Sequence, residues 1–280
     1  MNILEAIKKG SKILKKSGVE TSKLDSEILM SQVIQKNRVN IILNSNNKLS
    51  KNDFISYKTL IKQRSNKKPI SYLTGKKEFW KYEFHVTKDV LIPRPDTEII
   101  VEKALKLTTG KKSLKILDVG VGSGCIILSI LKERNNFYGT GVDINKKTLK
   151  ICKFNSIKLN ISSRLKLFKS DIDNFNYGKY DLIISNPPYI KKHKIKYLVR
   201  DIFDYEPKSA LDGGLDGLSE LKKVIISSSK LIKKNGLLIL EIGFDQAESV
   251  KKILKQNGFY IREVVKDFAG FTRCVISIKN

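Results

Sequence analysis

Two kinds of hydrophobic pattern divide the chain. Over roughly the first 65 residues, apolar residues recur at the three- and four-residue spacing of amphipathic helices, as at Ile3, Ile7 and Leu14. Further along, short apolar runs typical of buried strands alternate with glycine-containing turns and helical stretches. The pattern predicts a small helical unit followed by an α/β domain with a mostly parallel sheet.

The helical unit contains three predicted helices. Ser22 with Asp25, and Ser50 with Asp53, each fit a serine that caps a helix start and an acidic residue three positions later. Gly18 is a typical helix stop. We expect a small bundle that either caps the larger domain or grips a partner.

Seven apolar runs predict the strands of the α/β domain. They span residues 114–119, 138–142, 165–168, 180–185, 237–241, 260–265 and 274–278. Helices are expected from Cys125, after the cap Asn145, and over 218–231 and 246–254. Before the first strand, residues 79–86 alternate like part of a hairpin, and Asp96 or Thr97 is placed to cap a helix.

Composition and charge restrict the function less than the pattern does. The 280 residues carry a net charge of +26, which suits a nucleic-acid partner. The lysines, however, are spread along the whole chain as pairs, which is typical of solvated surface charge. No apolar run approaches a membrane span, and the amphipathic N-terminus is not a secretory signal, so we expect a cytoplasmic protein.

The cysteines and histidines speak against metal chemistry. Cys125, Cys152 and Cys274 stand alone without metal-ligand spacing, and only two histidines are present. We expect neither a disulfide framework nor a zinc centre, and no metal site.

A glycine-rich turn, Gly120-Val121-Gly122-Ser123-Gly124, follows the first predicted strand. In a doubly wound sheet this turn faces a nucleotide, and Asp143, which ends the next strand, can accept both hydroxyls of a ribose. The spacing lacks the third glycine that seats a pyrophosphate, which favours S-adenosylmethionine over NAD. Asp171, after the third strand, is placed to accept from the adenine amino group, with a solvated loop aspartate as the alternative.

The tetrapeptide Asn186-Pro187-Pro188-Tyr189 directly follows the apolar run 180–185. Two prolines end the strand and stiffen the loop, whose Asn186 side-chain carbonyl and Pro187 backbone carbonyl can receive an –NH2 group. Tyr189 adds a flat face for a planar amide or a base. The alternative is a Pro-Pro turn that merely ends a strand.

With these residues, the chain resembles the class I S-adenosylmethionine-dependent methyltransferases, and within them the HemK-like release-factor glutamine-N5 methyltransferases. Besides the two motifs above, residues 69–75, 91–98 and 206–217 are similar to the family's linker, to the start of its catalytic domain and to the loop after its tetrapeptide. The chain has Ile172 where some relatives place an aromatic residue. The resemblance covers nearly the whole chain.

This resemblance implies an α/β, Rossmann-like domain with a seven-stranded sheet at 93–280, a linker with a β-hairpin at 69–92, and a helical substrate-recognition domain at 1–68. It assigns to S-adenosylmethionine the residues Gly120, Val121, Gly122, Ser123, Gly124, Asp143, Asp171, Ile172 and Asn186. It assigns to the substrate the residues Asn186, Pro187, Pro188 and Tyr189, with Asn186, Pro187 and Tyr189 catalytic.

The implied reaction is methylation of the glutamine side-chain amide in the Gly-Gly-Gln motif of peptide-chain release factors, by an enzyme that acts as a monomer and needs neither a membrane nor direct nucleic-acid binding. Two alternatives stay open. A methyltransferase for adenine or cytosine amino groups in nucleic acid uses the same loop on a flipped base. A basic RNA- or ribosome-binding protein with a vestigial cofactor fold is the other, favoured by charge alone.

Overall fold

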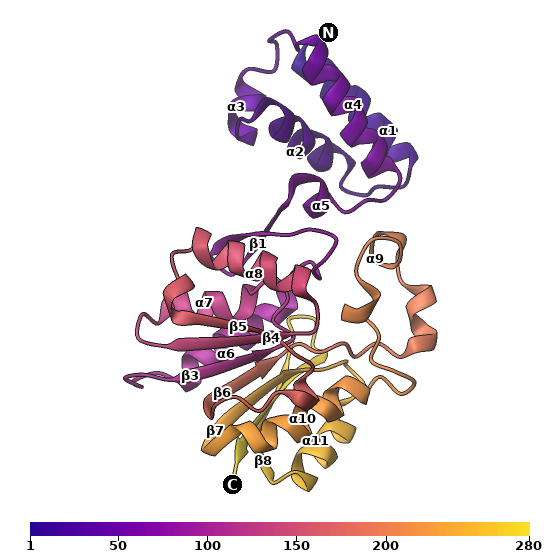
Figure 1. The fold of residues 1–280 in the computed structure, drawn as a ribbon. Coiled ribbons are helices and arrows are strands. Elements are labelled where there is room, and N and C mark those ends of the chain that lie inside the picture. The colour runs from indigo at the N-terminus through magenta and orange to yellow at the C-terminus, as the bar shows by residue number, and fades with distance from the viewer. The chain divides into compact units, whose positions relative to one another are not determined.

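The computed structural model describes all residues from Met1 to Asn280, and they form two compact units. Unit 1 consists of Met1–Lys76 together with Val199–Tyr205, and unit 2 consists of Lys77–Leu198 together with Glu206–Asn280. Figure 1 shows the elements of each unit along the chain. The functional domains expected at 1–68, 69–92 and 93–280 stay a prediction.

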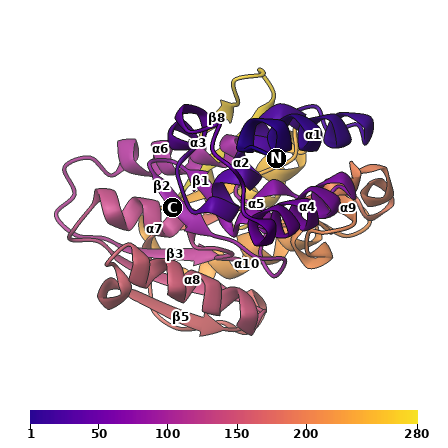
Figure 2. The ribbon, with the colours of Figure 1, turned by 90° about the horizontal axis from the view of Figure 1, so that it is seen from above.

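Unit 1 is the helical bundle expected from the hydrophobic spacing. Its helices are α1 (Ile3–Lys16), α2 (Ser22–Ile34), α3 (Arg38–Leu43), α4 (Lys51–Ser65), α5 (Ile70–Thr74) and α9 (Arg200–Phe203). Figure 2 shows α1, α2 and α4 from above, in indigo to purple. Fully buried Leu14, Leu29 and Met30 form the centre of its apolar core, because a helix stripe gains stability by leaving water.

An ion network buried in unit 1 joins residues far apart in the sequence. The Arg64 guanidinium lies 2.7 Å from a carboxylate oxygen of Asp25 and 2.7 Å from one of Asp201. The Tyr205 hydroxyl donates to the backbone oxygen of Asn66 at 2.8 Å. These contacts explain why Val199–Tyr205 clusters with the first 76 residues.

One of the two predicted caps is confirmed and the other is wrong. The Asp53 backbone N–H donates to the Ser50 hydroxyl at 3.1 Å, so Ser50 caps α4 as expected. By contrast, Ser22 is already inside α2, and no side chain caps that helix. Asp25 is ion-paired with Arg64 instead, since a buried guanidinium is a stronger partner than a backbone amide.

Unit 2 contains the predicted seven-stranded sheet, in the order β5-β4-β3-β6-β7-β9-β8. All neighbouring pairs are parallel except the two that involve β9. The strands are β3 (Lys115–Val119), β4 (Tyr138–Asp143), β5 (Leu165–Lys169), β6 (Tyr180–Ser185), β7 (Ile232–Glu241), β8 (Phe259–Lys266) and β9 (Thr272–Lys279). A separate hairpin joins β1 (Lys76–Phe79) to β2 (Tyr82–His85), so its turn falls inside the alternating stretch 79–86.

Helices cover both faces of the sheet. They are α6 (Glu98–Leu107), α7 (Cys125–Glu133), α8 (Lys146–Lys158), α10 (Ser219–Leu231) and α11 (Ala247–Gln256). Ile116 and Leu117, neighbours on β3, belong to different apolar clusters because successive strand residues point to opposite faces. Ile116 shares its cluster with α6 and α7, and Leu117 shares the other with α10 and α11.

The strand order changes direction between β3 and β6, which are paired neighbours in the centre of the sheet. At such a switch point the loops after two neighbouring parallel strands diverge and leave a crevice. The glycine-rich turn follows β3 and the Asn-Pro-Pro-Tyr loop follows β6, so both motifs lie at the same edge. None of the helices has both the length and the apolar composition for crossing a membrane.

Candidate active site

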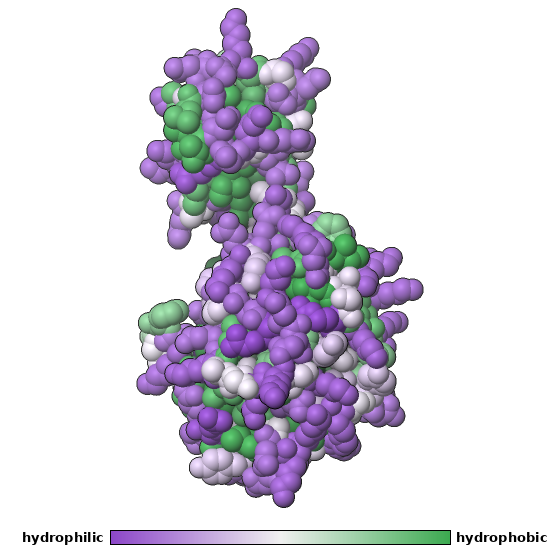
Figure 3. All heavy atoms as spheres, turned by 90° about the vertical axis from the view of Figure 1, so that its left-hand side faces the viewer, coloured by the Kyte–Doolittle hydropathy of each residue, from purple (hydrophilic) through white to green (hydrophobic).

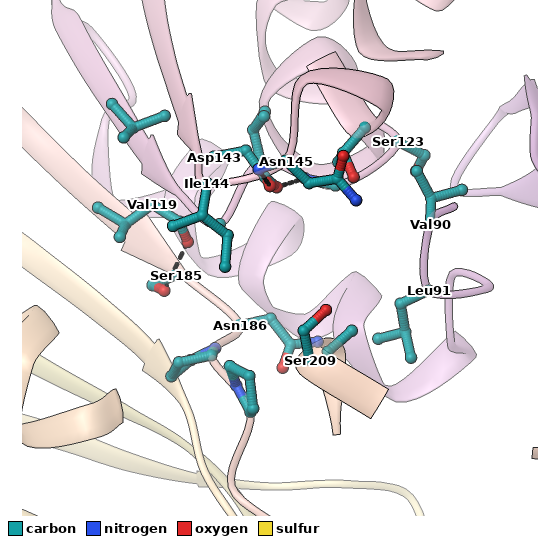
Figure 4. A pocket seen from close by; sticks show the side chains of 18 of the residues that line it. Val90, Leu91, Val119, Ser123, Asp143, Ile144, Asn145, Ser185, Asn186 and Ser209 are labelled. Atoms are coloured by element: carbon teal, nitrogen blue, oxygen red, sulfur yellow. Dashed lines mark hydrogen bonds between the residues drawn. The ribbon is translucent and has the colours of Figure 1, made fainter. Parts of the chain in front are cut away.

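A pocket of about 170 Å³ lies at this edge of unit 2. In Figure 4, Asp143, Asn186 and Leu91 mark three of its sides. The predicted residues that line it are Gly120, Val121, Gly122, Ser123, Asp143, Asp171, Ile172, Asn186, Pro187 and Pro188. The structure therefore brings ten of the predicted site residues together, whereas Gly124 and Tyr189 do not line the pocket.

The glycines of the turn have different reasons to be glycine. Gly120 adopts a φ of 73°, and a Cβ there would meet no atom within 4 Å, so the backbone conformation alone requires glycine and the space above it stays open. Gly124 adopts a φ of 83°, and its Cβ would lie 2.7 Å from the Cys152 sulfur. Gly124 thus serves the close packing at the start of α7 rather than the pocket wall.

A buried carboxylate without a partner lies beside the turn. Asp118 on β3 is 1% exposed, and neither of its carboxylate oxygens makes a hydrogen bond of normal geometry. Burial raises the pKa of Asp118 to about 8, the charge of Asp143 adds to this rise, and the Ile127 backbone amide opposes it. Asp118 does not line the pocket, so this carboxyl is a buried group beneath the turn rather than part of the pocket wall.

Asp143 shapes the turn and keeps acceptor capacity for a ligand. Its carboxylate accepts from the backbone N–H of Gly122 at 3.2 Å and of Asn145 at 2.9 Å. Burial raises the pKa of this carboxyl, while the two backbone bonds oppose the rise. Each oxygen of an ionised carboxylate has two lone-pair sites, so one remains on each for a hydroxyl group. Asn145 caps α8 as expected, by accepting from the Lys147 backbone N–H.

Two isoleucines, one after β4 and one after β5, give the pocket an apolar part of its wall. Ile172, 6% exposed, and Ile144, 56% exposed, both line the pocket. The Asp171 carboxylate accepts from the Asp173 backbone N–H at 3.2 Å, which caps a short 3-10 helix, Ile172–Asn174. Ile144 was missed by the sequence reasoning, although it directly follows the predicted ribose anchor Asp143.

The Asn-Pro-Pro-Tyr loop is held by polar contacts at both ends. The Ser185 hydroxyl, at the end of β6, donates to the Val119 backbone oxygen at 2.7 Å (Figure 4). The Asn186 side-chain NH2 donates to the Thr97 hydroxyl oxygen at 3.1 Å. The amide nitrogen is engaged there, and the Asn186 Oδ1 atom faces away from Thr97 without a protein donor. It therefore remains available as an acceptor.

Tyr189 points to a buried acid rather than into the pocket. Its hydroxyl donates to Glu241 Oε1 at 3.1 Å, and burial with the neighbouring carboxylate raises the pKa of Tyr189 far above its usual range. The Thr97 hydroxyl donates to the other oxygen, Glu241 Oε2, at 2.6 Å. Neither Thr97 nor Asp96 caps α6 as expected, since no side chain accepts from the first backbone N–H groups of that helix; the Thr97 hydroxyl instead donates to Glu241 and accepts from Asn186.

Arg94 borders the pocket and is fixed in place. Its guanidinium lies 2.6 Å from Glu206, a buried carboxylate that also accepts from the Ile92 backbone N–H at 3.4 Å. Arg94 stands between Pro93 and Pro95, so both its backbone and its side chain are held in place. No cluster of histidine, cysteine and acidic side chains in the structure could hold a metal ion.

Comparison with known families gives two matches along the chain. The model of the PrmC N-terminal domain matches residues 5–75, and the model of the methyltransferase small domain matches residues 96–263. Among solved structures, a methyltransferase from Pyrococcus furiosus is similar with a TM-score of 0.52 and 18% identity, over 70% of this chain and 88% of that one. At this identity the likeness concerns the fold.

Two relatives are similar over their full length. The release factor glutamine methyltransferase of Clostridium acetobutylicum is 39% identical over 283 residues, covering 100% of this chain and 99% of the relative. That of Buchnera aphidicola subsp. Schizaphis graminum is 38% identical over 280 residues, with 100% of both chains covered. With this agreement over both units, the chain belongs to the family of release factor glutamine methyltransferases.

Proposed function

We propose that this chain methylates the side-chain amide nitrogen of the glutamine in the Gly-Gly-Gln motif of peptide-chain release factors, with S-adenosylmethionine as methyl donor. The activity for which the relatives are named supports the substrate. The observation that carries the chemistry is the acceptor left at Asn186 Oδ1, since its amide nitrogen is bound by Thr97. An acceptor in a stiff loop at the pocket fits a substrate –NH2 group.

The residues of the pocket fit the proposed methyl donor. When bound, S-adenosylmethionine supplies an electrophilic methyl group on a positively charged sulfur. The open turn at Gly120 suits its charged amino-acid part, because a Cβ there would meet no atom and the space above the backbone is free. Asp143 would accept from the ribose hydroxyls, and Ile172 would offer an apolar face to the adenine.

The loop after β6 would hold the glutamine amide. Two acceptors would bind the two N–H groups of the glutamine amide, namely Asn186 Oδ1 and the backbone carbonyl of Pro187. Proline has no backbone N–H, so Pro187 presents no donor to the substrate –NH2 group. The lone pair of an amide nitrogen is delocalised, as its rotation barrier of roughly 18–20 kcal/mol shows. Two fixed acceptors orient this poor nucleophile and stabilise the positive charge that develops on the nitrogen.

Tyr189, predicted as catalytic, lies outside the pocket lining, so we propose that it supports the loop instead of packing on the substrate amide. Its hydroxyl bond to Glu241 fixes the ring at one end. The ring itself contacts the apolar cluster beneath β6 and β7. Tyr189 thus anchors the end of the loop whose start is anchored at Asn186.

The test is a labelled-methyl transfer assay from S-adenosylmethionine. Purified release factor, its variant with alanine in place of the Gly-Gly-Gln glutamine, and duplex DNA are offered side by side. Label on the wild-type release factor alone supports the proposal. Label on DNA supports the nucleic-acid amino-methyltransferase, and label on no substrate supports the non-catalytic RNA- or ribosome-binding protein.

The alternative that rests on charge, a basic RNA- or ribosome-binding protein, finds little support. The paired lysines Lys8, Lys9, Lys146 and Lys147 are exposed, and Figure 3 shows hydrophilic side chains over most of the face it presents. Spread surface charge of this kind promotes solubility rather than a defined site. A release-factor substrate also places the enzyme in the cytoplasm, and we expect it to act as a monomer.

A further inference from the structure

We infer that Thr97 and Glu241 are positioning residues that fix which atom of the Asn186 side-chain amide faces the substrate. The inference rests on the proposed function, in which Asn186 Oδ1 accepts a substrate N–H. Asparagine presents an acceptor or a donor to the pocket depending on a 180° turn of its amide. Only one of these orientations can receive an –NH2 group.

The three residues come from separate parts of unit 2 and form one chain of hydrogen bonds. Asn186 Nδ2 donates to Thr97 Oγ1 at 3.1 Å, and Thr97 Oγ1 donates to Glu241 Oε2 at 2.6 Å. Asn186 follows β6, Thr97 precedes α6, and Glu241 ends β7. Thr97 is 3% exposed and Glu241 is 1% exposed, so water cannot substitute for either partner.

The number of available hydrogens decides which group donates in each of these hydrogen bonds. An ionised carboxylate only accepts, so the single hydroxyl hydrogen of Thr97 is committed to Glu241. The Thr97 oxygen can then only accept, and the only donor that Asn186 offers is its NH2 group. The Oδ1 atom is thereby directed away from Thr97, whereas a turned amide would set Oδ1 against the Thr97 lone pairs with no hydrogen between them.

The negative charge of Glu241 is therefore needed to hold the Asn186 amide in this orientation. The Tyr189 hydroxyl donates to Glu241 Oε1 at 3.1 Å, so it does not compete with Thr97 for Oε2. Burial raises the pKa of Glu241 to about 7, and the bonds from Thr97 and Tyr189 oppose this rise. The other titratable or charged groups around this carboxyl are Arg273, which lowers its pKa, and Asp96, Cys125 and Cys274.

Protonation of Glu241 would release the constraint. A carboxylic acid can donate its own hydrogen to Thr97, whose hydroxyl hydrogen is then free to bond Asn186 Oδ1. The amide would turn and present its NH2 group to the pocket, where it repels the substrate –NH2 group. We therefore expect turnover to fall as pH decreases through about 7.

The experiment compares Thr97→Val and Thr97→Ser with wild type in the methyl-transfer assay. Valine keeps the volume and removes the hydroxyl, so we expect kcat to fall about tenfold, the value of one hydrogen bond, with unchanged affinity for S-adenosylmethionine. Thr97→Ser restores the hydroxyl and should restore kcat. Thr108→Val is the matched control, since Thr108 is 2% exposed and its hydroxyl bonds only backbone oxygens of its own helix.

Glu241→Gln tests the role of the charge. The amide does not titrate, so we expect the acidic limb near pH 7 to disappear from the kcat profile. Wild-type turnover in Thr97→Val, or an unchanged acidic limb in Glu241→Gln, would overturn the inference. A lower kcat for Thr108→Val equal to that of Thr97→Val would also overturn it, because loss of any buried hydroxyl would then suffice.

A second measurement separates this inference from the proposed function. In ¹⁵N-labelled protein, the Asn186 side-chain NH2 signal, assigned by its loss in Asn186→Ala, should exchange slowly with water in wild type and fast in Thr97→Val. Slow exchange without any methylation of release factor would support the hydrogen bonds from Asn186 to Thr97 and Glu241 but reject the proposed substrate. Equally fast exchange in both proteins would reject the positioning role of Thr97 and Glu241, whatever the substrate is.

Discussion

Replacing Asp118 with asparagine should stabilise unit 2 at alkaline pH. Asp118 is buried on β3, and neither carboxylate oxygen makes a hydrogen bond of normal geometry. Its pKa is raised from 3.8 to about 8. An acid with a raised pKa destabilises the fold only when ionised, so the cost is absent below pH 3.8, grows with pH, and is complete above about pH 8.

The size of the effect follows from the shift. The difference between 8 and 3.8 is about 4 units, and at about 1.4 kcal/mol per unit the full cost approaches 6 kcal/mol. Relaxation of the surroundings reduces this value, so we expect Asp118→Asn to gain several kcal/mol of unfolding free energy at about pH 9. At about pH 4 the variant and the wild type should agree.

The assay is urea unfolding at a series of pH values, without ligand. Trp80 is the single tryptophan of the chain and lies in unit 2, so its fluorescence reports the unfolding of that unit alone. The Asp118 charge also raises the pKa of Cys125 and Cys152, so the comparison is kept at or below about pH 9, and Asp245→Asn controls for the loss of an exposed carboxylate. Parallel pH curves for Asp118→Asn and wild type would refute the reasoning, as would a less stable variant at alkaline pH.

Three further predictions concern catalysis, packing and the helical unit. Asn186→Ala should bind S-adenosylmethionine normally but lose about 100-fold or more in kcat; near-normal turnover would reject its role. Gly124→Ala should destabilise unit 2 by about 1–3 kcal/mol, because the new methyl group meets a buried cysteine sulfur at a positive φ; Trp80 fluorescence in urea measures this, and an unchanged midpoint would contradict it. Arg64→Met should destabilise unit 1 by about 3 kcal/mol, since Asp25 and Asp201 lose their shared partner; circular dichroism in urea measures this, and a midpoint equal to wild type would count against it.

The fold was predictable from the sequence because its signals are local. Apolar runs mark all seven strands, and glycine or proline after β3 and β6 marks the two turns that border the pocket. Each such signal depends on residues only a few positions apart. These local signals, together with the family resemblance, selected twelve residues, of which ten are among those that line the pocket.

The partners of polar side chains could not be predicted in the same way. Thr97 fits a helix cap locally, but its hydroxyl bonds Glu241, 144 residues away. Asp25 fits a capping box, but Arg64 lies 39 residues further along. In both cases the side chain bonds a buried, charged partner instead of capping its helix, and only the fold brings that partner close. A charged residue at the end of the apolar run 237–241 was the one available hint.

The seven residues Val199–Tyr205 have a consequence for how members of this family can be recombined. They are encoded far from the first 76 residues but supply Asp201 to Arg64 and Tyr205 to Asn66 within the same unit. A chimera that exchanges only the N-terminal segment between two relatives would leave this arginine facing a foreign loop. Exchange of unit 1 between relatives should therefore give a stable protein only when both stretches of the gene are transplanted together.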